Sequence, residues 1–465
     1  MKIITATFLI PIRFFQILYK GIQFLMILKF TKDETKKPQK LKEIFEYLGG
    51  VFTKIGQIIS MRSDFIDPSY QEQLFDLQDK PKPFSYEKGI RIINKGLKNK
   101  NYFRVIEKEL FASGSISQIY KAIDQEGREV IIKVKRPHIS LQILIDVSIL
   151  KVLLLPLKLF GLDRSLKIYQ LIHEAHTILK EESDFRQEIK NLQLFETISS
   201  SMDKFITPKV YIEACNSNII TMDYISGVSF KEIMSSMNKG TPILNTVITE
   251  KLAIDFFEII MKMIFEVGFF HGDPHSGNIL YTQDEKIAFL DFGAVGCLSE
   301  RMKFLQINYF NSIANNNLDE AVDFFIRILR ENKKSDSFGF RKDLKSILYV
   351  WMMKIDDDNI PFSEKSLGSL MMESSFLATK YKFTLRSNSL LFFRVFLLVE
   401  PIFFNFNPTF NLKKATEKYI TQYYLSKYGK ELNYKKMMSN MYAFSELIQI
   451  LPSWAKKLLI ENLED

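Results

Sequence analysis

The chain places two of its 5 histidines in one short stretch, HGDPHSGN (271–278), and follows it with AFLDFG (288–293). Asn278 comes five positions after Asp273, and Asp291 comes 13 positions after Asn278. This spacing matches a kinase catalytic loop, in which an Asp is followed by an Asn and then by an Asp-Phe-Gly turn. Amide and carboxylate oxygens suit a hard ion such as Mg²⁺. We therefore expect Asn278 and Asp291 to hold the metal, and Asp273 to accept or orient the acceptor hydroxyl.

Two other interpretations of this stretch stay open. An aspartate that caps a helix and an asparagine in a turn are both common. His271, His275 and Asp273 could instead be zinc ligands, but no third histidine lies nearby, and the offset to Asp291 is then unexplained. Under the phosphoryl-transfer interpretation, we expect His271 to orient the loop through hydrogen bonds.

Phosphoryl transfer also requires a cation on the nucleotide phosphates. The sequence EVIIKVKRP (129–137) supplies Lys133 in the position of the strand lysine of kinases. Lys135 is two residues away and shares the strand face of Lys133, whereas Arg136 should point the other way. Gly127 is expected in a turn between two strands.

An acidic residue must hold the lysine in place. We expect EESDFRQEIKN (181–191) to form a helix that offers Glu182, Asp184 and Glu188. Residues 184 and 188 are one helical turn apart on one face. A solvated acidic helix face is the alternative for any one of them.

The loop before the lysine strand should approach the nucleotide. FASGSISQIYKA (111–122) stands there in place of a GxGxxG loop. Its small residues let backbone N–H groups line a phosphate: Ala112, Ser113, Gly114 and Ser115. The extended stretch 207–230 adds Met222 and Asp223 to the candidate nucleotide-binding residues.

The order of patterns along the 465 residues predicts an α+β protein. An amphipathic segment (1–30) and a helical extension (40–100) precede a small strand-rich lobe with a helical insert (101–230). A large helical lobe (231–410) and a helical C-terminal segment (411–465) follow. The apolar run near 389–406 is expected to be a buried helix of the large lobe, because Arg394 and Glu400 interrupt it.

Bulk composition restricts the partners. A net charge of +9 favours an acidic partner, such as nucleotide or an anionic membrane surface. Nucleic acid is disfavoured, because zinc-finger spacing, RNP-like strings and long Arg-rich arms are absent from the sequence. The 2 cysteines, Cys215 and Cys297, lie far apart, which argues against a disulfide framework or a cysteine-rich metal site and fits a reducing compartment.

Residues 1–30 carry Lys2, Arg13, Lys20 and Lys29 and no acid. The charges interrupt the segment too often for a clean spanning helix of about 20 apolar residues. We expect a basic amphipathic helix that lies in the membrane interface. The alternative is a helix packed on the core of the protein itself.

With these residues the chain resembles the AarF/UbiB family of atypical protein-kinase-like proteins, also called the ABC-one or ADCK family. KIGQIISMRSDFIDPSYQEQLFDLQDKPKPF (54–84) is similar to the KxGQ motif of the family and the sequence that follows it. ASGS stands at its alanine-rich loop, and EESDFRQEIKN resembles its ExD motif, with Glu182 and Asp184 as the pair. The resemblance runs from about residue 40 to about residue 410 and includes NPTFNL (407–412).

The resemblance implies a protein-kinase-like bilobal fold, with the KxGQ helices over the active site and Lys54 and Gln57 reaching toward the nucleotide. Glu188 would be the partner of Lys133, and these two residues with Asp273 would be catalytic. Mg-ATP would be the cofactor of an atypical kinase or ATPase that supports ubiquinone or other isoprenoid-lipid biosynthesis. Its partners would be an anionic membrane surface or a quinone-like lipid, together with proteins of quinone biosynthesis. The expected location is the cytoplasmic face of a membrane, the inner membrane in a bacterium.

Two departures from the family pattern leave functional alternatives. Ser276 replaces the usual proline of HGDPHPGN, and Gly114 stands where the family favours alanine, which bears on ATP versus ADP preference. A small-molecule kinase of the choline or aminoglycoside type shares HGDxHxxN, but the KxGQ stretch argues against its open acceptor cleft. A nucleotide-binding scaffold without turnover is the other alternative.

Overall fold

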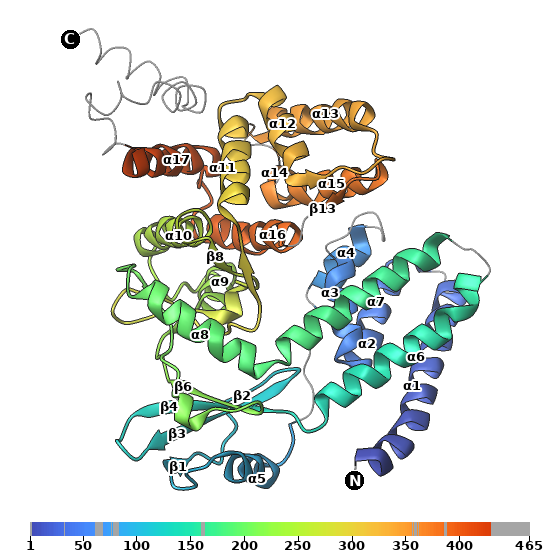
Figure 1. Ribbon diagram of the computed structural model, residues 1–465, viewed down its shortest axis with the longest axis vertical. Helices are drawn as coiled ribbons and strands as arrows, with labels where there is room; N and C mark the ends of the chain where they lie inside the picture. Colours follow the sequence, from blue (N-terminus) through green and yellow to red (C-terminus); the bar gives the residue numbers. More distant parts are fainter. Residues whose placement is uncertain are drawn as a thin grey trace. The chain divides into compact units, whose positions relative to one another are not determined.

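The computed structural model describes residues 2–31, 33–60, 68–75, 77, 83–159, 163–355, 357, 360, 362–385 and 388–428. The chain divides into two compact units (Figure 1). Unit 1 comprises Met1–Ser201, Ile206–Ser226 and Leu290–Ala294, and unit 2 comprises Met202–Phe205, Gly227–Phe289 and Val295–Asp465. The Asp-Phe-Gly turn therefore belongs to unit 1, whereas the catalytic-loop stretch 271–278 belongs to unit 2.

Unit 1 contains the predicted strand-rich lobe as one antiparallel sheet (Figure 1). Its strands are β1 (Phe103–Ile106), β2 (Ala112–Ser113), β3 (Ser117–Asp124), β4 (Glu129–Lys135) and β6 (Ile219–Asp223). They follow the order β1-β3-β4-β6, and β2 pairs with β3. Gly127 turns the chain between β3 and β4 with φ 83°, a left-handed conformation that glycine adopts without strain, as predicted. Helix α5 (Tyr86–Gly96) packs on the sheet through Ile93.

The described part of unit 1 has seven further helices; all of them except α8 form a bundle on one side of its sheet (Figure 1). They are α1 (Lys2–Phe30), α2 (Lys36–Leu48), α3 (Val51–Ser60), α4 (Pro68–Phe75), α6 (Ile139–Leu159), α7 (Asp163–Glu182) and α8 (Phe185–Ser199). Residues from α1, α2, α3 and α6 share one buried apolar cluster: Ile17, Ile44, Leu48, Phe52, Ile145 and Ile149. The KxGQ helix α3 is thus part of the bundle core. The rest of that motif at 61–67, 76 and 78–82 lies outside the described residues.

One helix prediction was wrong. EESDFRQEIKN is two helices, because α7 ends at Glu182 and α8 begins at Phe185. The Asp184 carboxylate accepts hydrogen bonds from the backbone N–H groups of Arg186 and Gln187 and so caps α8. An aspartate N-cap satisfies the free N–H groups of a new helix start, which favours the break over one continuous helix.

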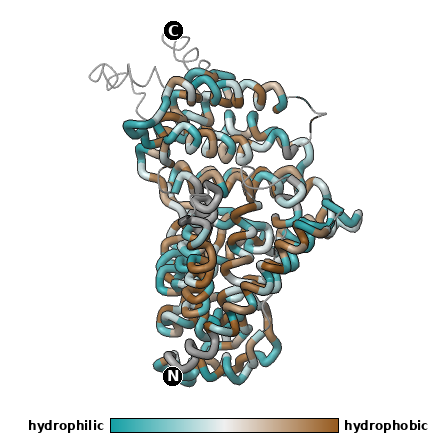
Figure 2. The backbone as a smooth tube through the Cα atoms, turned by 90° about the vertical axis from the view of Figure 1, so that its right-hand side faces the viewer, coloured by the Kyte–Doolittle hydropathy of each residue, from teal (hydrophilic) through white to brown (hydrophobic). Residues whose placement is uncertain are grey.

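Unit 2 is mainly helical. Its helices are α9 (Phe230–Asn238), α10 (Thr246–Met261), α11 (Glu300–Ala314), α12 (Leu318–Ile328), α13 (Ser337–Ile355), α14 (Phe362–Lys365), α15 (Leu367–Lys380), α16 (Ser389–Phe406) and α17 (Leu412–Tyr428). A π-helical turn, η2 (Lys262–Val267), extends α10. Residues 429–465 of the expected C-terminal helical segment lie outside the described residues. The tube in Figure 2 alternates brown and teal along many of the helices, as amphipathic helices do.

Short strands position the catalytic-loop stretch of unit 2. They are β7 (Val228–Ser229), β8 (Phe269–His271), β9 (Ile279–Tyr281), β10 (Ile287–Phe289) and β11 (Val295–Cys297), with β5 (Phe205–Ile206) beside β10. Two further short strands, β12 (Leu329–Arg330) and β13 (Thr384–Leu385), pair within the part expected to be wholly helical. The expected buried helix at 389–406 is confirmed as α16, in which Phe392, Phe396 and Phe403 are almost fully buried.

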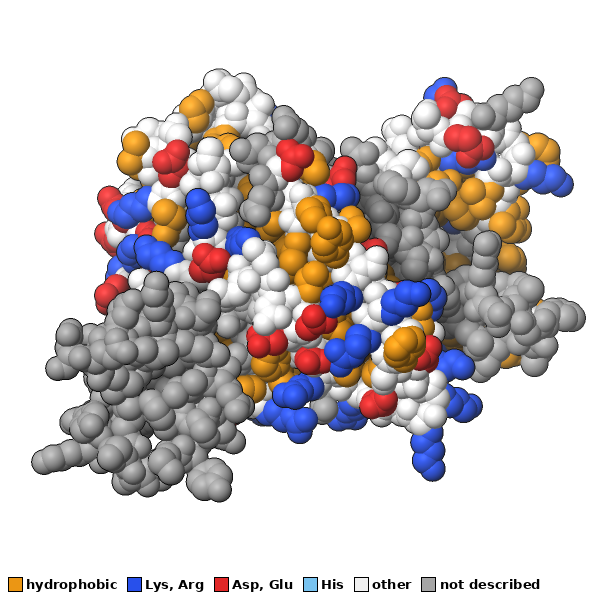
Figure 3. Space-filling model, turned by 90° about the horizontal axis from the view of Figure 1, so that it is seen from above, with side chains coloured by type: hydrophobic (Ala, Val, Ile, Leu, Met, Phe, Trp, Pro, Cys, Tyr) orange, Lys and Arg blue, Asp and Glu red, His pale blue; other side chains and the backbone are white. Residues whose placement is uncertain are grey.

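Two helices in the described residues are long and apolar enough to cross a membrane, by length and composition alone. They are Ile10–Phe30 in α1 and Ile139–Pro156 in α6, of which 6% and 33% are buried. For α1 this differs from the expectation that its charges would rule out a spanning helix, because the basic residues are spread widely enough to leave a long apolar window. On the face shown in Figure 3, the described basic and acidic side chains are interspersed rather than gathered into one basic field.

Candidate phosphoryl-transfer site

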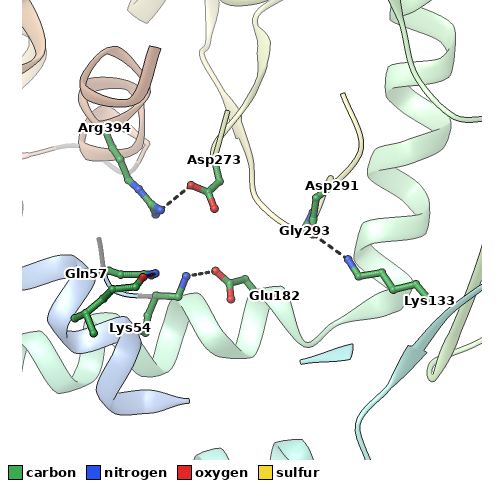
Figure 4. Close-up of polar contacts among 9 residues, drawn as sticks. Lys54, Gln57, Lys133, Glu182, Asp273, Asp291, Gly293 and Arg394 are labelled. Carbon is green, nitrogen blue, oxygen red and sulfur yellow. Dashed lines mark hydrogen bonds and ion pairs between the residues drawn. The ribbon is translucent and has the colours of Figure 1, made fainter. Parts of the chain in front are cut away.

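Lys133 is the centre of a buried charge cluster in unit 1. Its Nζ lies 2.6 Å from Oε1 of Glu188 and 3.1 Å from Oδ2 of Asp291 (Figure 4 shows the contact with Asp291). Strand β4 carries the lysine, and the first turn of α8 carries Glu188, whose side chain is 1% exposed. The predicted pairing of Lys133 with Glu188 is therefore confirmed, and the Asp-Phe-Gly aspartate joins the same pair.

Lys133 is shared by two carboxylates. One ammonium group faces two carboxylates, and Oε2 of Glu188 has no hydrogen-bond partner in the described part of the chain. Burial would lower the pKa of Lys133, but the carboxylates of Asp291 and Glu188 outweigh it and raise that pKa above its usual range. Burial raises the pKa of Glu188, although Lys133 opposes the shift. The carboxylate oxygens of the partly exposed Asp291 fit a hard divalent cation such as Mg²⁺.

Asp291 is held in a defined orientation by its own turn. Its Oδ1 accepts the N–H of Gly293 at 2.9 Å. Asn191 of α8 donates from Nδ2 to the carbonyl of Phe292 at 2.8 Å, and the ring of Phe292 packs on Phe195 with centroids 4.8 Å apart. Helix α8 thus supplies both the acidic partner of Lys133 and the anchor of the Asp-Phe-Gly turn.

The small-residue loop lies directly before β3. Ala112 and Ser113 form β2, and the N–H of Gly114 donates to the carbonyl of Ser117. Arg136 holds this loop: its Nε donates to the carbonyl of Gly114 at 2.9 Å, and a terminal nitrogen donates to Oγ of Ser113 at 2.6 Å. Sequence reasoning placed Arg136 on the opposite strand face from Lys133 but missed its contact with the loop. Phosphate binding by the loop, including Ser115, stays a prediction.

The KxGQ and ExD residues meet within unit 1. Nζ of Lys54 in α3 lies 2.5 Å from Oε1 of Glu182 at the end of α7 (Figure 4). Gln57 donates from Nε2 to the carbonyl of Leu77 at 3.1 Å. Asp184, the other ExD acid, is the cap of α8. The structure therefore joins Lys54 to Glu182 and leaves the predicted nucleotide contacts of Lys54, Gln57, Glu182 and Asp184 untested.

Met222 and Asp223 lie at the end of β6. The side chain of Met222 is buried, and β6 pairs Met222 with Ile131 of the lysine strand. The Asp223 carboxylate accepts hydrogen bonds from the N–H of Lys209 and the hydroxyl of Tyr211. Asp223 thus stabilises its own chain segment, and its predicted nucleotide contact stays untested.

The catalytic-loop stretch in unit 2 is organised by its histidines. Nδ1 of buried His271 accepts the N–H of Asp273 at 3.0 Å, which confirms the expected orienting hydrogen bond. Nδ1 of His275 accepts the N–H of Gly277 at 3.1 Å at the start of η3 (Ser276–Asn278). Among the described residues, no three His, Cys, Asp or Glu side chains form a group that could hold a metal ion, so the zinc interpretation has no structural support.

Arg394 is a site residue that sequence reasoning missed. Its guanidinium lies 2.9 Å from Oδ1 of Asp273 (Figure 4), and both side chains are largely buried, with exposed fractions of 16% and 24%. Arg394 was noted in the sequence only as a charge that interrupts an apolar run. A lone arginine in a buried helix needs an acidic or polar partner, so its presence in this apolar run could have predicted a buried ion pair.

Asn278 closes the 3-10 turn η3 and leads into β9. Its backbone N–H donates to the carbonyl of His275 at 2.9 Å. Asn278 belongs to unit 2 and Asp291 to unit 1, so their joint role as metal ligands stays a prediction.

The antiparallel sheet with its Lys-Glu-Asp cluster and the separate helical unit define a protein-kinase-like protein. Residues 76–324 match the family model described as the ABC1 atypical kinase-like domain. The chain belongs to this family, the AarF/UbiB family indicated by its motifs. Relatives named as kinases are consistent with a kinase-like domain rather than with an unrelated nucleotide-binding fold.

The relatives span most of the chain. Identity is 26% over 441 residues to an uncharacterised protein in the hydrogenase 1 5′ region of Clostridium pasteurianum, covering 94% of this chain and 80% of that protein. Identity is 25% over 434 residues to a probable protein kinase UbiB of Shewanella sp. strain W3-18-1, covering 92% and 76%. The chain spans 41% to 61% of the length of longer cyanobacterial and Arabidopsis chloroplast relatives.

A solved structure supports the fold alone. The Rv3197–erythromycin complex from Mycobacterium tuberculosis aligns with a TM-score of 0.51 at 20% identity, over 79% of this chain and 91% of that chain. At this identity the alignment supports the kinase-like bilobal α+β fold predicted from the sequence and carries no information on ligand.

Proposed function

We propose that this chain is a membrane-peripheral, Mg-ATP-dependent atypical kinase or ATPase that supports ubiquinone or other isoprenoid-lipid biosynthesis. Its partners would be an anionic membrane surface or a quinone-like lipid, and proteins of the same pathway. The expected location is the cytoplasmic face of a membrane. The name of the UbiB relatives supports the ubiquinone connection.

The observation that carries the proposal is the cluster of Lys133, Glu188 and Asp291. Phosphoryl transfer needs little covalent chemistry from the protein and depends on positioned charges around the phosphates. Glu188 fixes the ammonium of Lys133 so that it can contact nucleotide phosphates, and the turn around Gly293 aims Asp291. Mg²⁺, held by Asp291 and Asn278, would neutralise charge on the transferred phosphoryl group.

Asp273 would orient the attacking hydroxyl or water. His271 holds the backbone at Asp273, and Arg394 holds its carboxylate, so the carboxylate has little freedom to rotate. A preoriented carboxylate reduces the entropy lost in aligning the acceptor.

One observation favours a second candidate, a nucleotide-binding scaffold without turnover. A carboxylate already paired with a guanidinium is a weaker hydrogen-bond acceptor for a substrate hydroxyl, because its charge is partly neutralised. The two candidates differ in the effect of Asp273→Asn. That substitution abolishes phosphate release in an enzyme but leaves nucleotide binding and cellular function unchanged in a scaffold.

The decisive experiment measures ADP release from Mg-ATP by the purified protein, with and without anionic vesicles. Asp291→Asn should abolish the release, whereas Asp284→Asn, which changes an exposed aspartate between β9 and β10, should not. Turnover that is insensitive to Asp291→Asn would overturn the proposal. Tight ATP binding without turnover in either lipid condition would favour the scaffold. Rapid phosphorylation of a soluble alcohol would instead favour a choline-type kinase.

A further inference from the structure

Helix α1 exposes an apolar stripe that the bundle of unit 1 leaves uncovered. Ile12, Phe15, Tyr19, Ile22, Met26 and Phe30 recur at intervals of three or four residues, and each is at least 49% exposed. Residues at these intervals lie on one face of a helix. An exposed stripe of this length is unusual for a surface that faces only water.

The opposite face of α1 is fixed to the protein. Ile17 is buried in the cluster shared with α2, α3 and α6. Nε and a terminal nitrogen of Arg13 lie 2.7 and 2.8 Å from the two carboxylate oxygens of Asp146 in α6, and Arg13 also donates to the carbonyl of Leu48. The Asp146 side chain is 1% exposed, so detaching α1 would leave a buried carboxylate without its cation.

Two basic residues of α1, Arg13 and Lys20, do not interrupt the exposed stripe. Arg13 is turned toward Asp146, and the ammonium of Lys20 lies 4.5 Å from the ring centroid of Tyr47 in α2. These two charges therefore face the protein, whereas Lys29 is exposed beside Phe30. Between Ile10 and Phe30 the solvent side of α1 is mainly apolar.

The neighbouring helix α6 has the same character. Leu144, Val152 and Leu155 are each at least 48% exposed. The single acid of α6 is Asp146, which is buried against Arg13, and the sequence of α1 contains no acid at all. The exposed residues of the two helices therefore combine apolar side chains with the basic side chains of Lys29 and Lys151, which suits an anionic lipid surface. A second copy of the same basic helix would be repelled.

We infer that α1 lies in the plane of an anionic bilayer, with the stripe from Ile12 to Phe30 inserted between lipid headgroups. The ion pair between Arg13 and Asp146 holds the helix against the rest of unit 1. A spanning orientation would require α1 to leave the buried cluster and to break this ion pair. The inference rests on the proposed function only in placing the protein at a membrane. It adds which helix binds the bilayer and how that helix is oriented in it.

The test is flotation of the full chain with phosphatidylcholine vesicles and with equimolar phosphatidylcholine–phosphatidylglycerol vesicles, without nucleotide. The protein should float with the anionic vesicles. Combined substitution of Phe15→Asp and Ile22→Asp should weaken binding by about tenfold or more, because each change removes an inserted apolar side chain. Lys29→Glu should weaken binding to anionic vesicles alone. Phe338→Asp, at a side chain 82% exposed on α13, is the matched control and should bind normally.

Three results would overturn the inference. The first is that the Phe15 and Ile22 variant floats as well as the unmodified protein. The second is that the bound protein resists extraction with alkaline carbonate, as a protein with a spanning helix does. The third is that the protein isolated from cells has lost residues 1–30 by cleavage. A dimer that forms without lipid and is lost in the same variant would assign the stripe to a second copy and would equally overturn it. Circular dichroism checks that each variant is folded. Because flotation requires no ATP, a protein that releases ADP but does not float would contradict this inference and leave phosphoryl transfer standing.

Discussion

The guanidinium of Arg394 lies 2.9 Å from the carboxylate of Asp273, although 121 positions separate the two residues in the chain. Helix α16 is otherwise among the most apolar in the described part of the protein, and it delivers this one cation to the loop expected to face the acceptor. His271 fixes the same aspartate through the backbone. Asp273 is therefore oriented from two sides, by a neighbour in sequence and by a distant helix.

Replacing Arg394 tests whether this orientation matters. We expect Arg394→Ala to lower kcat for ADP release by about tenfold or more, because a misplaced catalytic group costs rate even when it is chemically intact. The KM for ATP should change little, and Arg394→Lys should restore part of the rate. Arg301→Ala, at an exposed position on α11, is the control. An increase of kcat in Arg394→Ala would show instead that the arginine restrains the enzyme.

The sequence was sufficient for the parts of the site that local pattern determines. Lys133 lies in a strand with a recognisable motif, and Asp291 follows from the offset to Asn278. Glu188 was one of three candidate acids, and only the family resemblance selected it as the partner of Lys133. Arg394 could not be found in this way, because its pairing depends on how α16 packs in the tertiary structure. The break before α8 could have been found, since Ser-Asp before a new apolar stretch is typical of a helix N-cap.

The pairing of Lys133 with Glu188 and Asp291 predicts an asymmetric effect on stability. Lys133→Met removes the cation that contacts both carboxylates and leaves Glu188 buried without it, and we expect a loss of about 3–5 kcal/mol in the free energy of unfolding. Glu188→Gln should cost less, because Lys133 keeps Asp291. In a double-mutant cycle measured by urea unfolding, the two effects should couple by about 1–3 kcal/mol.

The exposed pair of Lys251 and Glu285 provides the control for that cycle. Its side chains are 56% and 66% exposed, so solvent screens the charges and little or no coupling is expected. Strict additivity of Lys133→Met and Glu188→Gln would mean that the observed 2.6 Å contact does not contribute to the folded state in solution.

Glu400 predicts a dependence of stability on pH that is independent of catalysis. Burial raises the pKa of this fully buried carboxyl group to about 8, although the hydroxyl of Ser366 and the N–H of Gly368 hydrogen-bond to it. Because the folded protein binds the proton more tightly than the unfolded chain, the contribution of Glu400 is fully present below the ordinary value of 4.5 and is lost as pH rises toward 8. The loss is at most about 5 kcal/mol.

Urea unfolding at about pH 5 and about pH 9 checks this sign, on either side of the window set by burial. Glu400→Gln should flatten the profile, because its neutral amide can keep the contacts with Ser366 and Gly368 without being ionised. Glu364→Gln is the matched control, since Glu364 is half exposed and paired with Lys354. A Glu400→Gln profile as steep as that of the unmodified protein would show that other groups cause the pH dependence.

Gly114 and Gly127 lie in two loops of the same sheet, and substitutions at them distinguish an effect on nucleotide binding from an effect on stability. A Cβ added at Gly114 would meet no atom closer than 3.9 Å, and the backbone there is not left-handed, so Gly114→Ala should leave the fold intact. It should raise the free energy of unfolding by about 0.4–1 kcal/mol, because alanine restricts the unfolded chain. The stiffer loop should alter the ratio of ATP to ADP affinity several-fold, since the two nucleotides differ in the phosphate that the loop must accommodate. Isothermal titration with each nucleotide measures this ratio.

Gly127→Ala is the control. At Gly127 φ is +83° with open space around it, so the substitution should lower the free energy of unfolding by about 1 kcal/mol and leave nucleotide affinity unchanged. An unchanged affinity ratio in Gly114→Ala, or an equal change in Gly127→Ala, would contradict a role of the Ala-Ser-Gly-Ser loop at the phosphates.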